Sequence, residues 1–186
     1  MNHPIESENS NVCAFSLDDR PYELDFASWI EKWWEAYLYS DRKRRKGPVF
    51  MIPGKLIDSQ KDLNERSFAI DADKAILLSP INWISVSKSR EAKFQEEIRK
   101  TAKMEIDIVN KESISVEIDN TIQTRDYCYR ASTDIFELDG NLAISDGYWL
   151  FLKPGALSKG EHSIKSFGSC RSGKIQIPMN YYLTVK

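Results

Sequence analysis

One histidine, His162, lies in the part of the sequence that is expected to fold, because His3 belongs to a polar N-terminal segment. A Ser–His–Asp or Cys–His catalytic arrangement would need His162 as its base. Ser169 and Cys170 follow it closely, but no nucleophile-elbow pattern surrounds them. Strand-like alternation around His162 indicates a side chain that covers a sheet. The sequence therefore predicts a structural role for His162 and leaves any catalytic residues unknown.

Carboxylates are the second group of residues that could do chemistry. Their oxygens suit a hard cation such as calcium, and two clusters qualify: Asp71 with Asp73, and Asp134 with Glu137 and Asp139. The same residues stand where turns favour aspartate, and the sequence has neither H-E-x-x-H nor C-x-x-C. We therefore expect no metal and no other cofactor. Glycoside chemistry needs only two acids at the right separation, and 28 acidic residues do not single out a pair.

Five adjacent cations, Arg42 to Lys46, are the clearest charge feature. They could meet nucleic-acid phosphates or an acidic partner. Basic residues also suit a helix C-terminus, where they oppose the helix dipole, and Gly47-Pro48 would stop a helix directly after them. The whole chain has a net charge of -2, and no basic face interleaved with aromatics accompanies the run. We therefore expect a solvated turn rather than a nucleic-acid site.

Tryptophans are the remaining candidates. Trp29, Trp33 and Trp34 fall in one predicted helix, and Trp149 falls in a predicted strand. Aromatic faces can stack on a sugar or another flat ligand, but aromatic residues at helical spacing are more often part of a core. The sequence predicts core positions for them. These four residues remain the candidate ligand-binding residues if one of them reaches the surface.

The composition is that of one globular domain, with 186 residues, of which 41% are hydrophobic and 29% charged. Cys13, Cys128 and Cys170 have no zinc spacing, and their odd number favours reduced thiols in a cytoplasmic protein, with a Cys128–Cys170 disulfide as the alternative. The polar N-terminal segment lacks the features of a secretory signal. No apolar run approaches the roughly 18 residues of a membrane span, so we expect no membrane partner.

Residues 1–20 are expected to form a flexible tail and residues 21–186 a single domain. Apolar residues at helical spacing predict helices near 25–40, capped by Asp25, and near 89–106, capped by Ser89. The segments 75–80 and 81–86 are either two strands or one strand bent at Pro80. Short apolar segments bounded by turn residues predict about nine strands in all: 49–52, 67–70, 75–86, 114–118, 126–131, 134–138, 147–153, 162–167 and 174–185.

A hairpin is predicted near the C-terminus. Asp146-Gly147 is expected to form a turn into a strand over 148–153, which Pro154 ends. That strand is expected to pair antiparallel with 162–167. Its alternation predicts that Trp149 is buried against the first helix or an opposing sheet.

Three blocks of sequence together resemble a family of uncharacterised bacterial and archaeal proteins. The resemblance covers most of the chain from about residue 25, and Gly155-Ala156 departs from it as an insertion after Lys153-Pro154. It implies an αβ sandwich-type domain and brings no activity, cofactor or catalytic residue. The blocks are Trp29-Ile-Glu-Lys-Trp33-Trp34; Gly47 to Gly54 followed by Ile70 to Asn82; and Asp146 to Pro154 with Gly160 to Ile164 and Tyr181 to Val185.

The sequence thus predicts an α+β, β-rich fold: an antiparallel β-sandwich of immunoglobulin-like type, or a flattened barrel, of about nine strands with two packed helices. The expected function is a non-catalytic module that binds a small molecule or a protein. One alternative is a hydrolase-like enzyme that uses carboxylates, with Tyr or Arg, in a cleft between helix and sheet. The other is binding of nucleic acid or an acidic partner through Arg42 to Lys46. A pocket with converging acids would favour the enzyme, and a shallow groove would favour binding.

Overall fold

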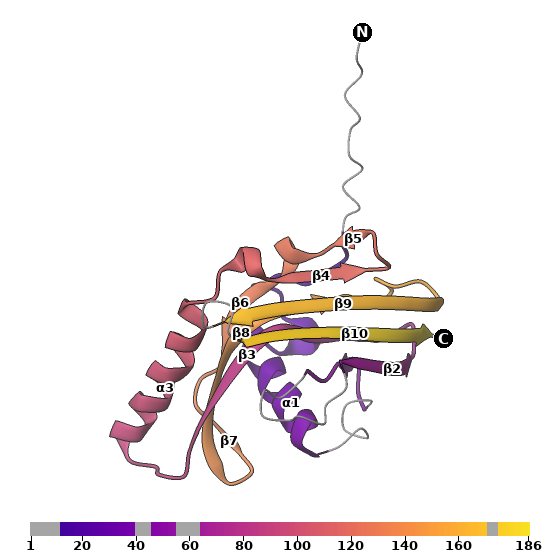
Figure 1. Cartoon of the computed structure of the whole chain (residues 1–186). Helices are drawn as coiled ribbons and strands as arrows, with labels where there is room; N and C mark the ends of the chain where they lie inside the picture. The colour runs from indigo at the N-terminus through magenta and orange to yellow at the C-terminus, as the bar shows by residue number, and fades with distance from the viewer. Residues whose placement is uncertain (1–11, 40–45, 55–63, 171–174) are drawn as a thin grey trace.

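The structure is a computed structural model that describes residues 12–39, 46–54, 64–170 and 175–186. These residues form an α+β, β-rich fold of two five-stranded sheets and two α-helices (Figure 1), as predicted. The first sheet has the order β1 (Val49–Met51), β3 (Ala75–Ser87), β8 (Asn141–Leu152), β6 (Tyr129–Ser132), and β7 (Phe136–Leu138) also pairs with β8. The second has the order β2 (Glu65–Ile70), β10 (Ile175–Val185), β9 (Gly160–Cys170), β4 (Ser115–Ile118), β5 (Ile122–Gln123). The helices are α1 (Phe26–Tyr39) and α3 (Ala92–Asp107).

Both sheets are mixed, whereas the prediction was antiparallel. β1 runs parallel to β3, and β2 runs parallel to β10. Parallel neighbours need a crossover connection, and between β1 and β3 the chain passes through β2 in the other sheet. Alternation of apolar residues cannot reveal this, because it is the same for either strand direction. The described strands close no barrel.

The molecule has three layers, and β8 separates two cores. Successive strand residues point to opposite faces, so Leu150 and Leu152 enter the core between the sheets, while Trp149 and Phe151 enter the core under α1. Figure 1 shows β9 and β10 in front of β3 and β8, with α1 behind them. Trp149 is fully buried, as predicted.

Residues 75–87 form one strand with a bulge next to Pro80, which is the second of the two alternatives that the sequence left open. The register between β3 and β8 shifts between Leu78 and Ile81, so Leu78 and Ile81 both face the core between the sheets. The sheets approach closely here. A Cβ on Gly168 of β9 would lie 2.5 Å from the Pro80 carbonyl oxygen, so only glycine fits.

α3 covers the second half of β3 and the first half of β8. Ile98 and Ala102 of the predicted helix stripe pack on Ile144, with Trp83 beside them. The predicted cap is wrong: the N-cap residue is Glu91, without a side-chain cap, and the Ser89 hydroxyl accepts a hydrogen bond from the Glu91 amide at 3.3 Å. At α1 the prediction is confirmed, since Asp25 accepts from the Ser28 amide at 2.8 Å.

The predicted C-terminal hairpin is wrong. β8 pairs with β3, β6 and β7, whereas β9 pairs with β10 and β4, so 148–153 and 162–167 lie in different sheets. Asp146-Gly147 is no turn but the middle of β8. Gly147 is needed because β3 passes close to β8 at this point, and not because the chain turns. A Cβ added to Gly147 would lie 2.4 Å from the Cβ of Asn82.

Residues 12–15 fall within the tail expected over residues 1–20, but they pair with the first sheet. The Phe15 amide donates to the Phe151 carbonyl oxygen at 2.8 Å, and the Lys153 amide donates to the Cys13 carbonyl oxygen at 2.8 Å. Residues 12–15 therefore extend the first sheet beside β8, because their apolar side chains can be buried there. Residues 1–11 lie outside the described part of the chain.

Candidate functional site

The four tryptophans predicted as ligand residues lie in the core, with exposed fractions between 0% and 5%. The Trp33 and Trp149 rings meet edge to face at 5.3 Å between centroids. Trp33 Nε1 donates to the Ile52 carbonyl oxygen at 2.8 Å, and Trp34 Nε1 donates to Ser145 Oγ at 2.9 Å. Their core interpretation is confirmed, and none of the four rings offers an open stacking face at the surface, because each is almost fully buried. Trp29 still contributes to the wall of a surface recess.

His162 has a structural role, as predicted. Its Nδ1 lies 2.7 Å from Asp119 Oδ2, and its Nε2 lies 2.8 Å from the Ser158 carbonyl oxygen. Cys170 is at the other end of β9, eight residues away, which is roughly 26 Å along a strand. The histidine and the thiol therefore cannot act together.

No disulfide joins the cysteines of the described residues, and Cys128 and Cys170 are buried. Burial is the main cause that raises the pKa of the Cys128 thiol to about 12, so it stays protonated at neutral pH. Within the described ranges, no three His, Cys, Asp or Glu side chains gather in a way that could hold a metal ion. Of the basic run, Arg42 to Arg45 lie outside the described residues, and Lys46 is exposed.

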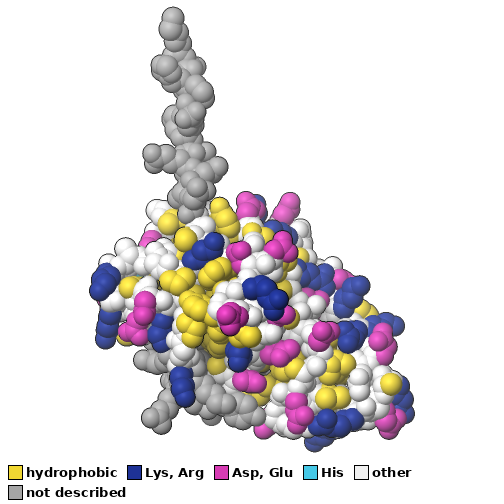
Figure 2. Space-filling model, turned by 180° about the vertical axis from the view of Figure 1, so that it is seen from behind, with side chains coloured by type: hydrophobic (Ala, Val, Ile, Leu, Met, Phe, Trp, Pro, Cys, Tyr) yellow, Lys and Arg dark blue, Asp and Glu magenta, His cyan; other side chains and the backbone are white. Residues whose placement is uncertain are grey.

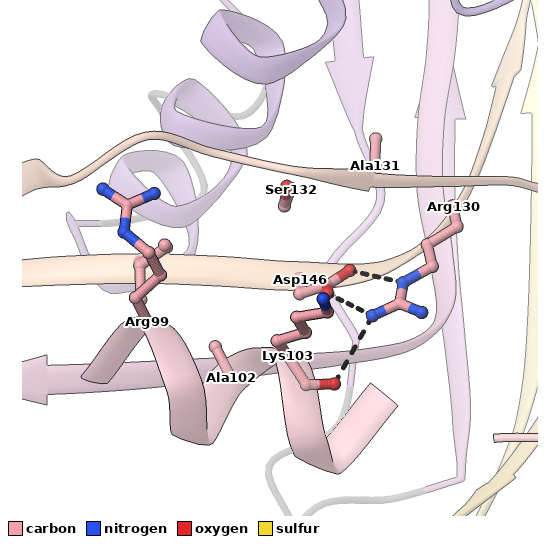
Figure 3. A pocket seen from close by; sticks show the side chains of 8 residues that line it. Arg99, Ala102, Lys103, Arg130, Ala131, Ser132 and Asp146 are labelled. Atoms are coloured by element: carbon pink, nitrogen blue, oxygen red, sulfur yellow. Dashed lines mark hydrogen bonds and ion pairs between the residues drawn. The ribbon is translucent and has the colours of Figure 1, made fainter. Parts of the chain in front are cut away.

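In the described part of the chain, the largest group of charged side chains around a recess lies away from these residues. A recess of about 460 Å³ lies between α3 and the strands β6 and β8. We call it the α3 recess. Its lining includes the buried apolar residues Ala102 and Ile144, and Figure 3 shows charged side chains near Ala102. It is lined by Arg99, Ala102, Lys103, Arg130, Ala131, Ser132, Ile144 and Asp146.

Strand register explains how Arg130 and Asp146 meet. β6 pairs antiparallel with β8, with Ser132 opposite Asp146 and Arg130 opposite Tyr148. Residues two apart share a face of the sheet, so Arg130 is a diagonal neighbour of Asp146, within reach of a long side chain. Arg130 Nε and Nη2 donate to the two Asp146 oxygens at 3.1 and 2.6 Å.

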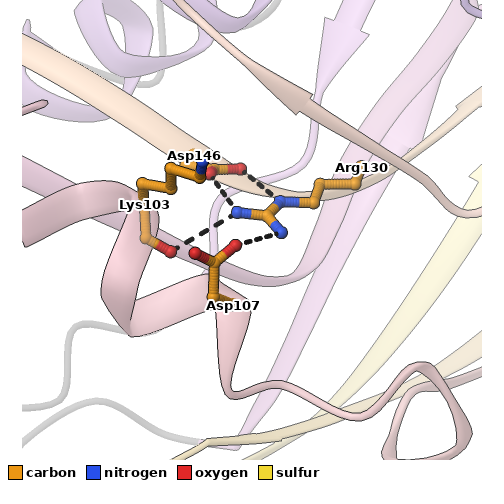
Figure 4. Close-up of polar contacts among 4 residues, drawn as sticks. All are labelled: Lys103, Asp107, Arg130 and Asp146. Atoms are coloured by element: carbon orange, nitrogen blue, oxygen red, sulfur yellow. Dashed lines mark hydrogen bonds and ion pairs between the residues drawn. The ribbon is translucent and has the colours of Figure 1, made fainter. Parts of the chain in front are cut away.

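The same guanidinium ties the strands to α3 (Figure 4). Arg130 Nη1 donates to Asp107 Oδ1 at 2.7 Å, and Nη2 also donates to the Lys103 carbonyl oxygen at 3.4 Å. A cation is favourable at this C-terminal end of the helix. The hydrogen bonds to Asp146, and then those to Asp107, outweigh desolvation and raise the pKa of Arg130 further above its usual value. Arg130 therefore stays charged, and its first role is to hold α3 on the sheet.

The other two cations of the recess, Arg99 and Lys103, are held less tightly by carboxylates than Arg130 is. Arg99 and Lys103 are one helical turn apart on α3, so both project towards β6 and β8. Arg99 Nη1 lies 3.9 Å from Asp134 Oδ1, and the Asp134 side chain is 96% exposed, so this contact contributes little. No carboxylate of the described residues forms an ion pair with Lys103. These two cations can therefore meet a ligand anion.

Sequence reasoning missed every charged residue of this recess. The one local signal was the i, i+4 spacing of Arg99 and Lys103, which places both cations on the same side of α3. Because charged residues of both signs occur along the whole helix, this pair does not stand out in the sequence. Arg130 and Asp146 are 16 residues apart, and only the β6–β8 register brings them together.

No protein-family model, no curated protein and no solved structure matches the chain significantly. The family resemblance drawn from the sequence blocks therefore stays a prediction. No helix in the described ranges is both long and apolar enough to cross a bilayer.

Proposed function

We propose that the protein is a non-catalytic binding module whose α3 recess holds a small molecule through a carboxylate or phosphate group. The observation that carries the proposal is the charge of the lining: three cations and one acid in a chain whose net charge is -2. The volume of about 460 Å³ is within the range of small-molecule sites.

The cations have separable tasks in this proposal. Arg130 is saturated by Asp146, Asp107 and a helix carbonyl, so it fixes the walls. Arg99 and Lys103 supply the charge for the ligand, and Ser132, which is exposed, supplies a hydroxyl. A guanidinium can bind a carboxylate or phosphate through two parallel hydrogen bonds, and the ammonium adds a point charge.

The enzyme alternative finds some support, because Asp146 lines a cleft between helix and sheet and Asp107 binds the same guanidinium, that of Arg130. However, both carboxylates bind Arg130, and Asp146 accepts with both oxygens. A general acid or base needs to exchange a proton with substrate, and a guanidinium clamp opposes this. The binding module is therefore the better supported function, and the nucleic-acid alternative stays a prediction.

Titration with methyl phosphate and with acetate, which carry an acidic group and no aromatic ring, followed by amide chemical shifts at low salt, tests the proposal. We expect saturable shifts confined to α3, β6 and β8, and at least a tenfold weaker affinity in Arg99→Gln/Lys103→Gln. Lys100→Gln is the matched control, since Lys100 is an exposed α3 lysine that does not line the recess. Equal affinity in the double variant, or no saturable shift in the wild type, would contradict the proposal.

A further inference from the structure

A second recess lies on the opposite, outer side of the first sheet, where the start of α1 faces the entry to β1. Its volume is about 430 Å³. We call it the Tyr22 recess. Its walls are mainly apolar, and three charged residues stand among them. The apolar and aromatic residues are Tyr22, Leu24, Trp29, Ala36, Pro48 and Met51, and the charged ones are Lys32, Glu35 and Lys46.

Tyr22 has an unfavourable backbone conformation at its position in this wall. Tyr22 and Glu23 both have positive φ, at 55° and 68°, a left-handed conformation that costs non-glycine residues stability. The turn persists because Arg20 and Pro21 carbonyl oxygens accept the Glu23 and Leu24 amides. The Pro21 carbonyl oxygen also accepts from Trp29 Nε1 at 2.9 Å.

The fold gains little from the Tyr22 ring itself. The residue is 41% exposed, and the ring meets Trp29 edge to face at 5.9 Å between centroids. Two left-handed residues in succession thus hold a large aromatic side chain at the surface instead of in the core. Strain of this kind is typical of ligand sites, where the surrounding structure fixes a geometry that binding uses.

We infer that the Tyr22 recess is a second binding site, for a flat aromatic molecule that carries an acidic group. Tyr22 and the edge of Trp29 offer aromatic contacts, and the apolar walls favour burial of a ring. The charges on the lining, two lysines against one glutamate, favour an anionic substituent over a cationic one. Figure 2 shows the face opposite that of Figure 1, where apolar side chains gather in one area among charged ones.

This inference does not depend on the α3 recess. The first sheet lies between the two recesses. The two sites also differ in chemistry, because the α3 recess offers cations and no aromatic ring. A ligand of the Tyr22 recess should therefore depend on its ring, whereas a ligand of the α3 recess should depend on its acidic group alone.

Isothermal titration of the full chain with 2-naphthoate tests the inference. We expect saturable binding, a loss of at least tenfold in affinity in Tyr22→Asn, and a smaller loss in Lys32→Gln/Lys46→Gln. Asparagine tolerates positive φ, so Tyr22→Asn should keep or raise the Tm while it removes binding. Tyr182→Asn is the matched control, because Tyr182 is a similarly exposed tyrosine (45%) on β10 without positive φ; it should leave the affinity unchanged.

Three results would overturn the inference. These are no saturable 2-naphthoate binding by the wild type, unchanged affinity in Tyr22→Asn, and a lower Tm in Tyr22→Asn, which would show that the ring supports the fold. Binding that is lost in Arg99→Gln/Lys103→Gln but not in Tyr22→Asn would assign the ligand to the α3 recess and would equally contradict this second site.

Discussion

Two tryptophans that pack against each other should respond very differently to the same substitution. Trp33 and Trp149 are both buried, but Trp33 Nε1 donates to the Ile52 carbonyl oxygen at 2.8 Å, whereas Trp149 Nε1 is one of two buried side-chain polar atoms in the described residues without a partner. Substitution by Phe removes the same atoms from each site, so the loss of packing is similar. The difference between the two variants therefore reports the indole hydrogen bond.

The magnitude follows from the cost of an unpaired buried polar group, about 1–3 kcal/mol. Trp33→Phe leaves the Ile52 carbonyl oxygen unpaired and adds that cost, while Trp149→Phe removes an unpaired N–H and recovers a similar amount. We expect Trp33→Phe to be less stable than Trp149→Phe by at least about 2 kcal/mol. With a urea m-value of about 2 kcal/mol/M for a domain of this size, the unfolding midpoints should differ by about 1 M.

Urea unfolding followed by far-UV circular dichroism gives both midpoints, and equal m-values would show that the variants unfold alike. Trp29→Phe is a matched control, because Trp29 Nε1 also donates to a carbonyl oxygen, that of Pro21, at 2.9 Å. It should behave like Trp33→Phe. Equal midpoints for Trp33→Phe and Trp149→Phe, or a lower one for Trp149→Phe, would refute this account of the aromatic core.

Three further predictions concern the sheets. Gly147→Ala should destabilise the fold by about 2–3 kcal/mol in urea unfolding, because its Cβ would overlap Asn82; a neutral effect would contradict the close approach. Arg130→Leu should cost about 3–5 kcal/mol by leaving Asp146 charged and buried, and Arg130→Leu/Asp146→Leu should recover most of this. Partial burial lowers the pKa of His162, but its hydrogen bonds and the nearby carboxylates outweigh this and raise the pKa. The stability that they provide is therefore complete below about pH 6.5 and is lost as pH rises through the folded-state pKa. The Tm of the wild type should accordingly fall as pH rises above about 6.5, and that of His162→Gln should not.

The sequence by itself determined what is local. Apolar residues at helical spacing placed α1 and α3, and strand alternation placed Trp149 and Leu150 on opposite faces of one strand, as the structure has them. Pro80 marked the bend in β3, because proline cannot donate in a ladder. These predictions succeeded because periodicity reports which side of an element is buried, and burial of apolar area is the main force that holds the element in place.

The sequence by itself did not determine which strands pair with each other. Periodicity is the same whichever strand lies alongside, so the partners of β8 and β9 and the parallel pairs at the sheet edges were decided by the path of the chain between the sheets. Asp146-Gly147 shows the consequence: the dipeptide is typical of a turn, but β3 passes so close to β8 that glycine is required in mid-strand.

Both recesses likewise depend on tertiary structure. The α3 recess requires the register of β6 on β8, which makes Arg130 a diagonal neighbour of Asp146. It also requires the docking of α3, which brings Asp107 to Arg130 and adds Arg99 and Lys103 to the lining. The Tyr22 recess requires a left-handed turn that tyrosine disfavours by itself. Backbone hydrogen bonds within the turn and the tertiary contact between Trp29 Nε1 and the Pro21 carbonyl oxygen stabilise it. A charged or strained residue carries no periodic signal, because its position is set by one specific neighbour rather than by an average preference for burial.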